Sequence, residues 1–281
     1  MAELPDIQQT KPKIEIPISQ VGVQNVKVPF MLESRGGGFH QMIADVSMRT
    51  SLLSSRRGIS MSRLHMTLSK YLNQPLKHKL IFQILSDLAG SQDEKESFMS
   101  FDFKLPMSRT SPATNHAYPL YYDCKFEGSV TDYDQFSFFQ GVRVQYASYC
   151  PCSAALSMDL KGKGKKGFPH AQRSYADVVV KIDPPNYVWL EDIIETVESN
   201  IATLPYPIIK RPDEQEIARI AAENPMFVED AIRLISLSLF HKKDYVDWIV
   251  KCTHEESIHT SEAIAMNWKG VPGGFDGTYY F

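Results

Sequence analysis

The sequence contains no long apolar run, no excess of positive charge and only four cysteines. A membrane-spanning helix needs about 20 consecutive apolar residues, and no stretch of the chain approaches that length. The formal net charge of -3 argues against a general nucleic-acid-binding protein, which is usually basic. The polar start, MAELPDIQQTKPK, lacks the apolar core of a secretory signal. These absences predict a soluble, cytoplasmic protein that binds neither a membrane nor nucleic acid.

The few cysteines are expected to be reduced thiols, because no export signal precedes them. Two of them, Cys150 and Cys152, are separated by a single proline. This spacing is too short for a relaxed disulfide, and it differs from the C-x-x-C of zinc knuckles and thioredoxin-like motifs. We expect the pair at the end of a strand, where alternate side chains point to opposite sides. One thiolate could then bind a metal while the other faces a substrate; the alternative is two small buried hydrophobic residues.

The rest of the chain has the profile of a globular protein, with 43% hydrophobic and 22% charged residues. Residues 1–13 are polar and are expected to be loose. Alternating apolar residues predict strands over 14–32 and 39–53, and apolar residues three and four apart predict helices over 60–72 and 75–90. By the same patterns, further strands are expected at 97–107, 119–130, 136–149, 173–182, 244–256 and 263–268, and further helices at 190–200, 212–223 and 225–240. The order predicts an α+β fold in which antiparallel sheets pack against helix pairs.

Two more clusters carry candidate ligands. His170, in the segment PHAQRS, is expected where a loop enters a strand, so that a ring nitrogen could face a metal; a solvated loop histidine is the alternative. The segment from Lys210 to Glu214 is expected to begin a helix, and an acidic first turn fully explains Asp213. Glu214 could still bind a metal, and Lys210 with Arg211 could hold a phosphate.

A third cluster, HEESIH at 254–259, supplies Glu256 and His259. In an extended segment these two side chains fall on different faces, but at a bend they could converge with Cys150 and His170. A Cys/His/Glu/His set suits zinc, manganese or ferrous iron.

Glu229, in the segment ENPMFVED, stands at a helix that otherwise carries an apolar stripe. A carboxylate there could accept two N–H bonds from the edge of a guanine-type base. The alternative is a solvent-facing glutamate.

Taken together, the segments CPCS, PHAQRS, KRPDE, ENPMFVED and ESIH resemble the GTP cyclohydrolase IB family. The segments GVQNVKVP and MSRL resemble that family's N-terminal half, so the similarity runs from about residue 15 to 270. The resemblance implies a tunnelling fold (T-fold) of tandem ββααββ-like units, which we place at 14–130 and 131–281. It also implies a homotetramer with active sites at subunit interfaces.

The implied reaction is the metal-dependent conversion of GTP and water to 7,8-dihydroneopterin triphosphate and formate. This is the first step of tetrahydrofolate synthesis, and it also feeds queuosine-type deazapurines. The implied ligands of Zn²⁺, Mn²⁺ or Fe²⁺ are Cys150, His170, Glu214 and His259. The implied catalytic residues are Cys150, Cys152, His170 and Glu256, the last as a ligand or a base. The implied substrate contacts are Glu229 and Cys152, with Lys210, Arg211 and Arg63, and also Arg56 and Arg57, as candidate cations for the triphosphate.

Two features depart from the family's pattern. Thr260, Ser261 and Glu262 follow ESIH, where family members often carry a second histidine, and KGKGKK at 161–166 lengthens the connection after the cysteines. Three rival functions stay open. The first is an archaeal-type cyclohydrolase that yields a cyclic phosphate, and the second is a T-fold deazaguanine nitrile reductase that uses NADPH without metal. The third is a non-catalytic purine-binding protein.

Overall fold

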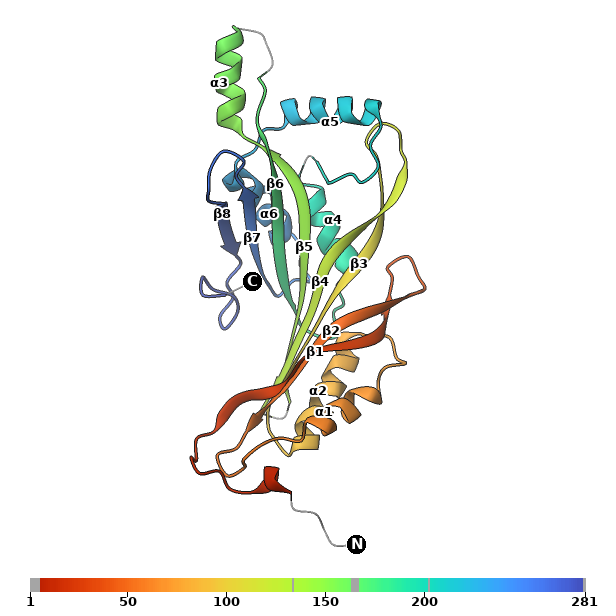
Figure 1. The fold of residues 1–281 in the computed structure, drawn as a ribbon, viewed down its shortest axis with the longest axis vertical. Helices are drawn as coiled ribbons and strands as arrows, with labels where there is room; N and C mark the ends of the chain where they lie inside the picture. The colour runs from red at the N-terminus through yellow and green to blue at the C-terminus, as the bar shows by residue number, and fades with distance from the viewer. Residues whose placement is uncertain (1–5, 133, 163–166, 202, 280–281) are drawn as a thin grey trace. The chain divides into compact units, whose positions relative to one another are not determined.

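A computed structural model describes residues 6–132, 134–162, 167–201 and 203–279. Within these residues the chain forms eight strands, six α-helices and a short 3-10 helix, η1 (Ile7–Gln9) (Figure 1). The strands follow one another in the sheet in chain order, β1 to β8. Every pair with a described register, such as β1 with β2 and β6 with β7, is antiparallel. The α+β class is therefore confirmed. Of the segment predicted to be loose, residues 1–5 lie outside the described residues.

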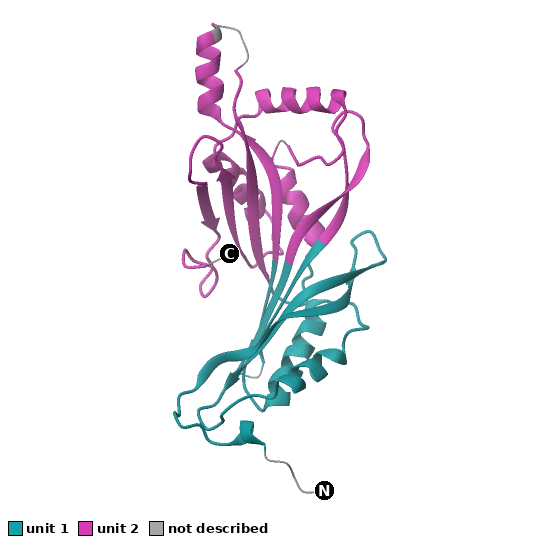
Figure 2. Cartoon of the chain, viewed as in Figure 1, with its two compact units in different colours: residues 1–104, 125–140, 182–187 teal, residues 105–124, 141–181, 188–281 magenta. Residues whose placement is uncertain are grey.

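Two compact units divide the chain (Figure 2). Unit 1 contains residues 1–104, 125–140 and 182–187, and unit 2 contains residues 105–124, 141–181 and 188–281. The elements of the first half are β1 (Ile18–Glu33), β2 (Phe39–Leu52), α1 (Met61–Ser69), α2 (His78–Gln92), β3 (Ser97–Thr110), β4 (Ala117–Thr131) and β5 (Gln135–Tyr149). The last three strands each contribute residues to both units. The tandem boundary at residue 130 stays a prediction.

In unit 1, helices α1 and α2 pack against each other and against β1 and β2. Leu64, Ile84 and Leu88 are at most 1% exposed, because apolar residues recur every three or four positions along each helix. The predicted helix pair is therefore confirmed, with bounds that differ by a few residues at each end.

The elements of the second half are α3 (Pro151–Lys161), β6 (Ala171–Ile182), α4 (Leu190–Glu198), α5 (Arg211–Glu223), α6 (Val228–Phe240), β7 (Asp247–Glu255) and β8 (Ala263–Trp268). Helix α6 packs on β7 and β8, and α4 lies beside α6. Ile193, Ile235 and Leu239 are fully buried there. Among the described residues, no helix is long and apolar enough to cross a membrane.

Two local expectations were wrong. The chain does not stay extended through the cysteines, since α3 begins at Pro151, directly after β5. Proline is favoured in a first helical turn because its missing N–H needs no partner there. The last predicted helix begins at Val228 rather than at Pro225, which lies in the preceding loop. Of the KGKGKK loop, residues 163–166 lie outside the described residues.

The start of α5 confirms the structural explanation of Asp213. Its carboxylate accepts hydrogen bonds from the backbone N–H groups of Ala113, Thr114 and Lys210 and from the Thr114 hydroxyl. Burial favours the neutral form of this carboxyl, but the four hydrogen bonds outweigh it and hold its pKa well below the usual range. Asp213 therefore attaches α5 to the loop at 113–114, and the helix start is fixed.

Gly167 provides a test of how α3 is packed. A Cβ atom at this position would lie 2.0 Å from the Ala154 carbonyl oxygen in α3, so the backbone would have to move. We expect Gly167→Ala to lower the free energy of unfolding by about 1–3 kcal/mol and to displace His170, three residues later. Urea unfolding would measure the loss of stability, and a crystal structure of the variant would show the displacement. Gly90→Ala is the matched control, because a Cβ atom on α2 meets nothing within 4 Å. We expect it to be neutral or stabilising; equal losses in both variants would contradict the packing argument.

Candidate active site

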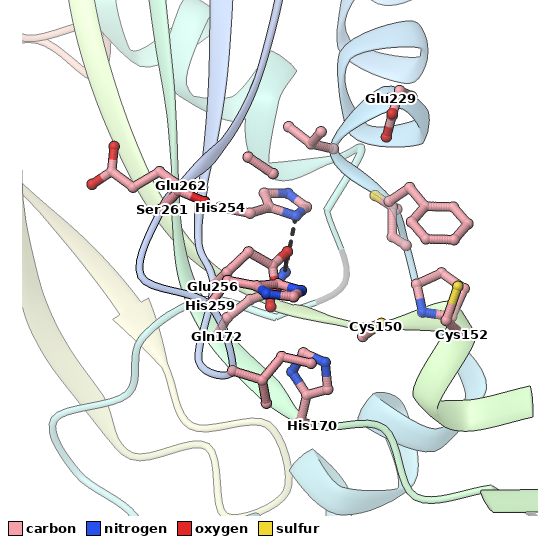
Figure 3. A pocket seen from close by; sticks show the side chains of 16 residues that line it. Cys150, Cys152, His170, Gln172, Glu229, His254, Glu256, His259, Ser261 and Glu262 are labelled. Atoms are coloured by element: carbon pink, nitrogen blue, oxygen red, sulfur yellow. Dashed lines mark hydrogen bonds between the residues drawn. The ribbon is translucent and has the colours of Figure 1, made fainter. Parts of the chain in front are cut away.

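A pocket of about 390 Å³ lies in unit 2, where several element ends meet (Figure 3). It is lined by the first turn of α3 with the residue before it, the entry to β6, the first turn of α6 with the loop before it, and the segment from the end of β7 to the start of β8. A pocket of this size matches those that hold small ligands. Of the predicted site residues, it brings together Cys150, Cys152, His170, Glu229, Glu256 and His259.

The two cysteines line the pocket from the start of α3. Cys150 is the residue before the helix and is half-buried, whereas Cys152 belongs to the first turn and is exposed. They do not point to opposite sides of a strand, as we had expected, because the chain turns into a helix between them. Both residues nevertheless line the same pocket.

Three hydrogen bonds connect Cys150 to His170. The Cys150 N–H donates to the His170 carbonyl at 3.2 Å. The hydroxyl of Ser153 donates to the Cys150 carbonyl at 3.1 Å and accepts from the His170 N–H at 3.0 Å. The last residue of CPCS thus fixes the cysteine loop against the entry to β6.

The His170 ring is held by one nitrogen and offers the other. Nδ1 lies 2.9 Å from the Ser257 hydroxyl. Nε2 is buried and has no hydrogen-bond partner among the described residues. A ring nitrogen that is buried without a partner, on a ring fixed through its other nitrogen, is the arrangement typical of a metal-binding histidine. The prediction that His170 stands where a loop enters a strand is confirmed.

The segment after β7 bends, which brings Glu256 and His259 to the same pocket. Glu256 accepts a hydrogen bond at 3.0 Å from the side-chain amide of Gln172 on β6. Glu229 is exposed in the first turn of α6. The loop before it is attached to the end of β5, because the Met226 N–H donates to the Tyr149 carbonyl at 2.8 Å.

The remaining predicted residues do not line this pocket. Glu214, Lys210 and Arg211 are exposed at the start of α5. Arg63 lies on α1 in unit 1 and donates to the Ser91 carbonyl at 3.2 Å. Their roles stay predictions. Arg56 has a structural partner, since it forms an ion pair with Glu94 at 2.5 Å.

The donor atoms of the pocket are of the types that bind a divalent metal. Their present spacing, however, is too wide for one ion. A half-buried thiol, an imidazole nitrogen without a partner and a carboxylate suit zinc or a similar cation. In the part of the chain that the structure describes, however, no three His, Cys, Asp or Glu side chains are close enough to bind one ion. No Lys or Arg occurs among the described residues that line the pocket.

Sequence reasoning missed a buried group behind Glu256. His254 is 1% exposed; its Nδ1 lies 3.2 Å from the Gln172 amide nitrogen and its Nε2 lies 3.0 Å from the Tyr146 hydroxyl. Burial lowers the pKa of His254 to about 4, although the nearby Glu229 charge opposes the shift. One signal was present: in PHAQRS, Gln172 is two residues from His170, so an extended chain would place both on the same side. The pairing of His254 with Ser174 across β6 and β7 could not be read from the sequence.

Comparison with solved structures places the fold in the class found in uricases. The uricase from Arthrobacter globiformis matches with a TM-score of 0.55 and 6% identity, covering 92% of this chain and 95% of that one. A hyperthermostable mutant of the Bacillus sp. TB-90 urate oxidase matches with a TM-score of 0.54 and 10% identity, covering 89% and 99%. At such low identity the likeness concerns the fold alone.

Comparison of sequences is more specific. Residues 4–265 match the family described as type I GTP cyclohydrolase folE2. The GTP cyclohydrolase FolE2 of Thermotoga neapolitana is 32% identical over 94% of this chain and 97% of its own length, and that of Citrifermentans bemidjiense is 30% identical over 93% of both. The chain therefore belongs to the type I GTP cyclohydrolase family, a family of enzymes. The match confirms the predicted resemblance to GTP cyclohydrolases. The family it shows is FolE2, however, and not the IB family that the motifs suggested.

The burial of neutral His254 predicts a pH dependence of stability. The unfolded chain binds a proton at this residue near its usual pKa of 6.5, whereas the folded chain binds it only near pH 4. The contribution of His254 to stability is therefore complete above pH 6.5 and is lost as the pH falls toward 4, by up to roughly 3 kcal/mol. Urea unfolding at pH 7 and pH 5 should show a smaller pH dependence in His254→Leu than in the wild type. His65→Leu, at an exposed position on α1, should keep the wild-type pH dependence of stability. The same change in unfolding free energy between pH 7 and pH 5 in wild type and His254→Leu would contradict the argument.

Proposed function

We propose that this protein is a cytoplasmic, metal-dependent GTP cyclohydrolase that converts GTP and water to 7,8-dihydroneopterin triphosphate and formate. The product would serve tetrahydrofolate synthesis and the synthesis of queuosine-type deazapurines. The observation that carries the proposal is the pocket itself. It gathers two thiols, three carboxylates and a histidine nitrogen that has no partner among the described residues, all from segments far apart in a chain of this family.

The residues of the pocket can divide the work as follows. Glu229, exposed at the pocket, accepts the ring N–H and the exocyclic amine of guanine. Cys152 faces the substrate from the first turn of α3. Glu256, held by Gln172, moves protons between water and the ring nitrogens that change protonation when the imidazole ring of the base opens.

His170 and Cys150 are the proposed core of the metal site, with His259 and Glu214 completing the set. Divalent metal held there would supply hydroxide for attack on guanine C8 near neutral pH by lowering the pKa of water. The hydrogen bonds of Ser153 keep the Cys150 and His170 backbones in register, and Ser257 holds the His170 ring through Nδ1. Glu214 is exposed on α5 and would have to approach the pocket.

Cations for the triphosphate are proposed to come from outside the pocket lining. Its described lining contains glutamates and no Lys or Arg, which is a poor environment for a polyanion. Lys210, Arg211 and Arg63 are the candidates within the chain. This deficit also supports a homotetramer in which a second subunit completes each site.

The test is to incubate the purified protein with GTP and EDTA and then to restore Zn²⁺, Mn²⁺ or Fe²⁺ separately. We expect formate and, after oxidation, a fluorescent pterin triphosphate only when metal is present. Cys150→Ala should lower kcat at least about a hundredfold, and Cys152→Ala should do the same if its thiol acts on the substrate.

Cys124→Ala is the matched control, because this buried thiol lies in β4 and outside the pocket lining. It should cost stability and leave kcat within about twofold. Absence of formate with every metal would reject the proposal. A cyclic phosphate product, or NADPH oxidation with a deazaguanine nitrile and no metal, would replace it with one of the rival reactions.

A further inference from the structure

Behind Glu256 runs a chain of side-chain hydrogen bonds that the reaction as described above does not use. Gln172 is 6% exposed and His254 is 1% exposed. The Gln172 amide nitrogen lies 3.0 Å from Glu256 Oε1 and 3.2 Å from His254 Nδ1. The dashed lines in Figure 3 mark hydrogen bonds among these side chains. Both hydrogens of one amide group are thus used, one on the carboxylate and one on the imidazole.

These contacts determine which atom is the donor in each hydrogen bond. An ionised carboxylate only accepts, so the Gln172 amide must turn its nitrogen toward Glu256. His254 Nδ1, which faces the same nitrogen, must then be an acceptor, and the ring proton must sit on Nε2. Nε2 in turn donates to the Tyr146 oxygen at 3.0 Å. The Tyr146 hydroxyl is left to donate to its neighbour Cys252, with which it shares a hydrogen bond.

The groups at the far end of this series of hydrogen bonds stay uncharged. Burial raises the pKa of Cys252 to about 12 and raises that of Tyr146 as well, and burial lowers the pKa of His254 to about 4. All three groups are therefore neutral at physiological pH. A neutral, fully oriented support cannot exchange its proton with the substrate, but it can hold Gln172 in one orientation.

The hydrogen bonding of Gln172 differs from that of a side chain that only fills space. Gln172 Oε1 is buried and has no hydrogen-bond partner among the described residues. Leaving such an acceptor without a partner costs about 1–3 kcal/mol, which an apolar side chain of similar size would avoid. The side chain at this position is nonetheless an amide, and its nitrogen is directed at a carboxylate in the pocket.

We propose that Gln172 is a positioning residue that aims the Glu256 carboxylate at the substrate, and that His254 and Tyr146 lock the orientation of its amide. This inference rests on the proposed function, because it assigns Glu256 the proton transfers. Gln172 itself touches neither the substrate nor a metal in this account.

A double-mutant cycle tests the proposal. Gln172→Leu removes the amide at nearly constant volume, and we expect kcat to fall about tenfold to a hundredfold with little change in KM. In a Glu256→Gln background the same replacement should change kcat less than about twofold, because nothing is left to aim. A similar loss in both backgrounds, or no loss in the wild-type background, would overturn the proposal.

Gln140→Leu is the matched control. Gln140 is 1% exposed and its Oε1 also lacks a partner among the described residues, but it does not line the pocket. We expect its replacement to leave kcat unchanged, so that a general effect of removing a buried amide is separated from an effect on Glu256. If the wild type forms no pterin, the proposed function fails; if the wild type is active and the cycle is additive, only the present inference fails.

A second measurement depends on neither activity nor variants. Long-range ¹H–¹⁵N NMR correlation of the wild-type protein at pH 7 should show His254 as the neutral tautomer protonated at Nε2. A proton on Nδ1 would mean that Gln172 turns its oxygen toward His254 and cannot donate to both partners, which would overturn the proposal.

Discussion

The Ser153 hydroxyl joins the two segments on which the pocket depends, since it accepts from the His170 N–H and donates to the Cys150 carbonyl. Residues 151–169 separate these two partners, including the whole of α3. Because the hydroxyl uses both its donor and its acceptor capacity, the two backbones cannot move apart without leaving polar groups unpaired. The direct bond from Cys150 N–H to the His170 carbonyl closes the same junction.

Beyond this junction, single hydrogen bonds hold the other groups of the pocket in place. Ser257 holds His170 by Nδ1, and Nε2 has no partner in the part of the chain that the structure describes. Gln172 holds one oxygen of Glu256. The bond from Met226 N–H to the Tyr149 carbonyl holds the loop that leads to Glu229. Cys150, His170 and Glu256 thus lie directly beside the ends of α3, β6 and β7, which keeps their positions better defined than long loops would.

The sequence predicted the repetitive parts of this arrangement well and the junctions poorly. Strand alternation and helical periodicity locate β1, α2 and α6 because each buries a regular apolar face. Helix α3 was missed because it has no such face: Leu156 and Leu160 are 67% and 88% exposed, and the residue before Pro151 suggested an extended chain. Cys150, His170 and Glu256 were predicted as separate motifs. The role of His254 required the β6–β7 register, which depends on residues about 80 positions apart.

We propose that Cys150 and His170 form the core of a metal site beside a guanine nucleotide. A crystal structure of the protein grown with Zn²⁺ and a slowly hydrolysed GTP analogue would test it most directly, through the anomalous signal at the zinc edge. We expect a peak about 2.0–2.1 Å from His170 Nε2 and about 2.3 Å from Cys150 Sγ, with the guanine edge against Glu229. A metal bound elsewhere, or a nucleotide whose base lies outside the pocket, would contradict it.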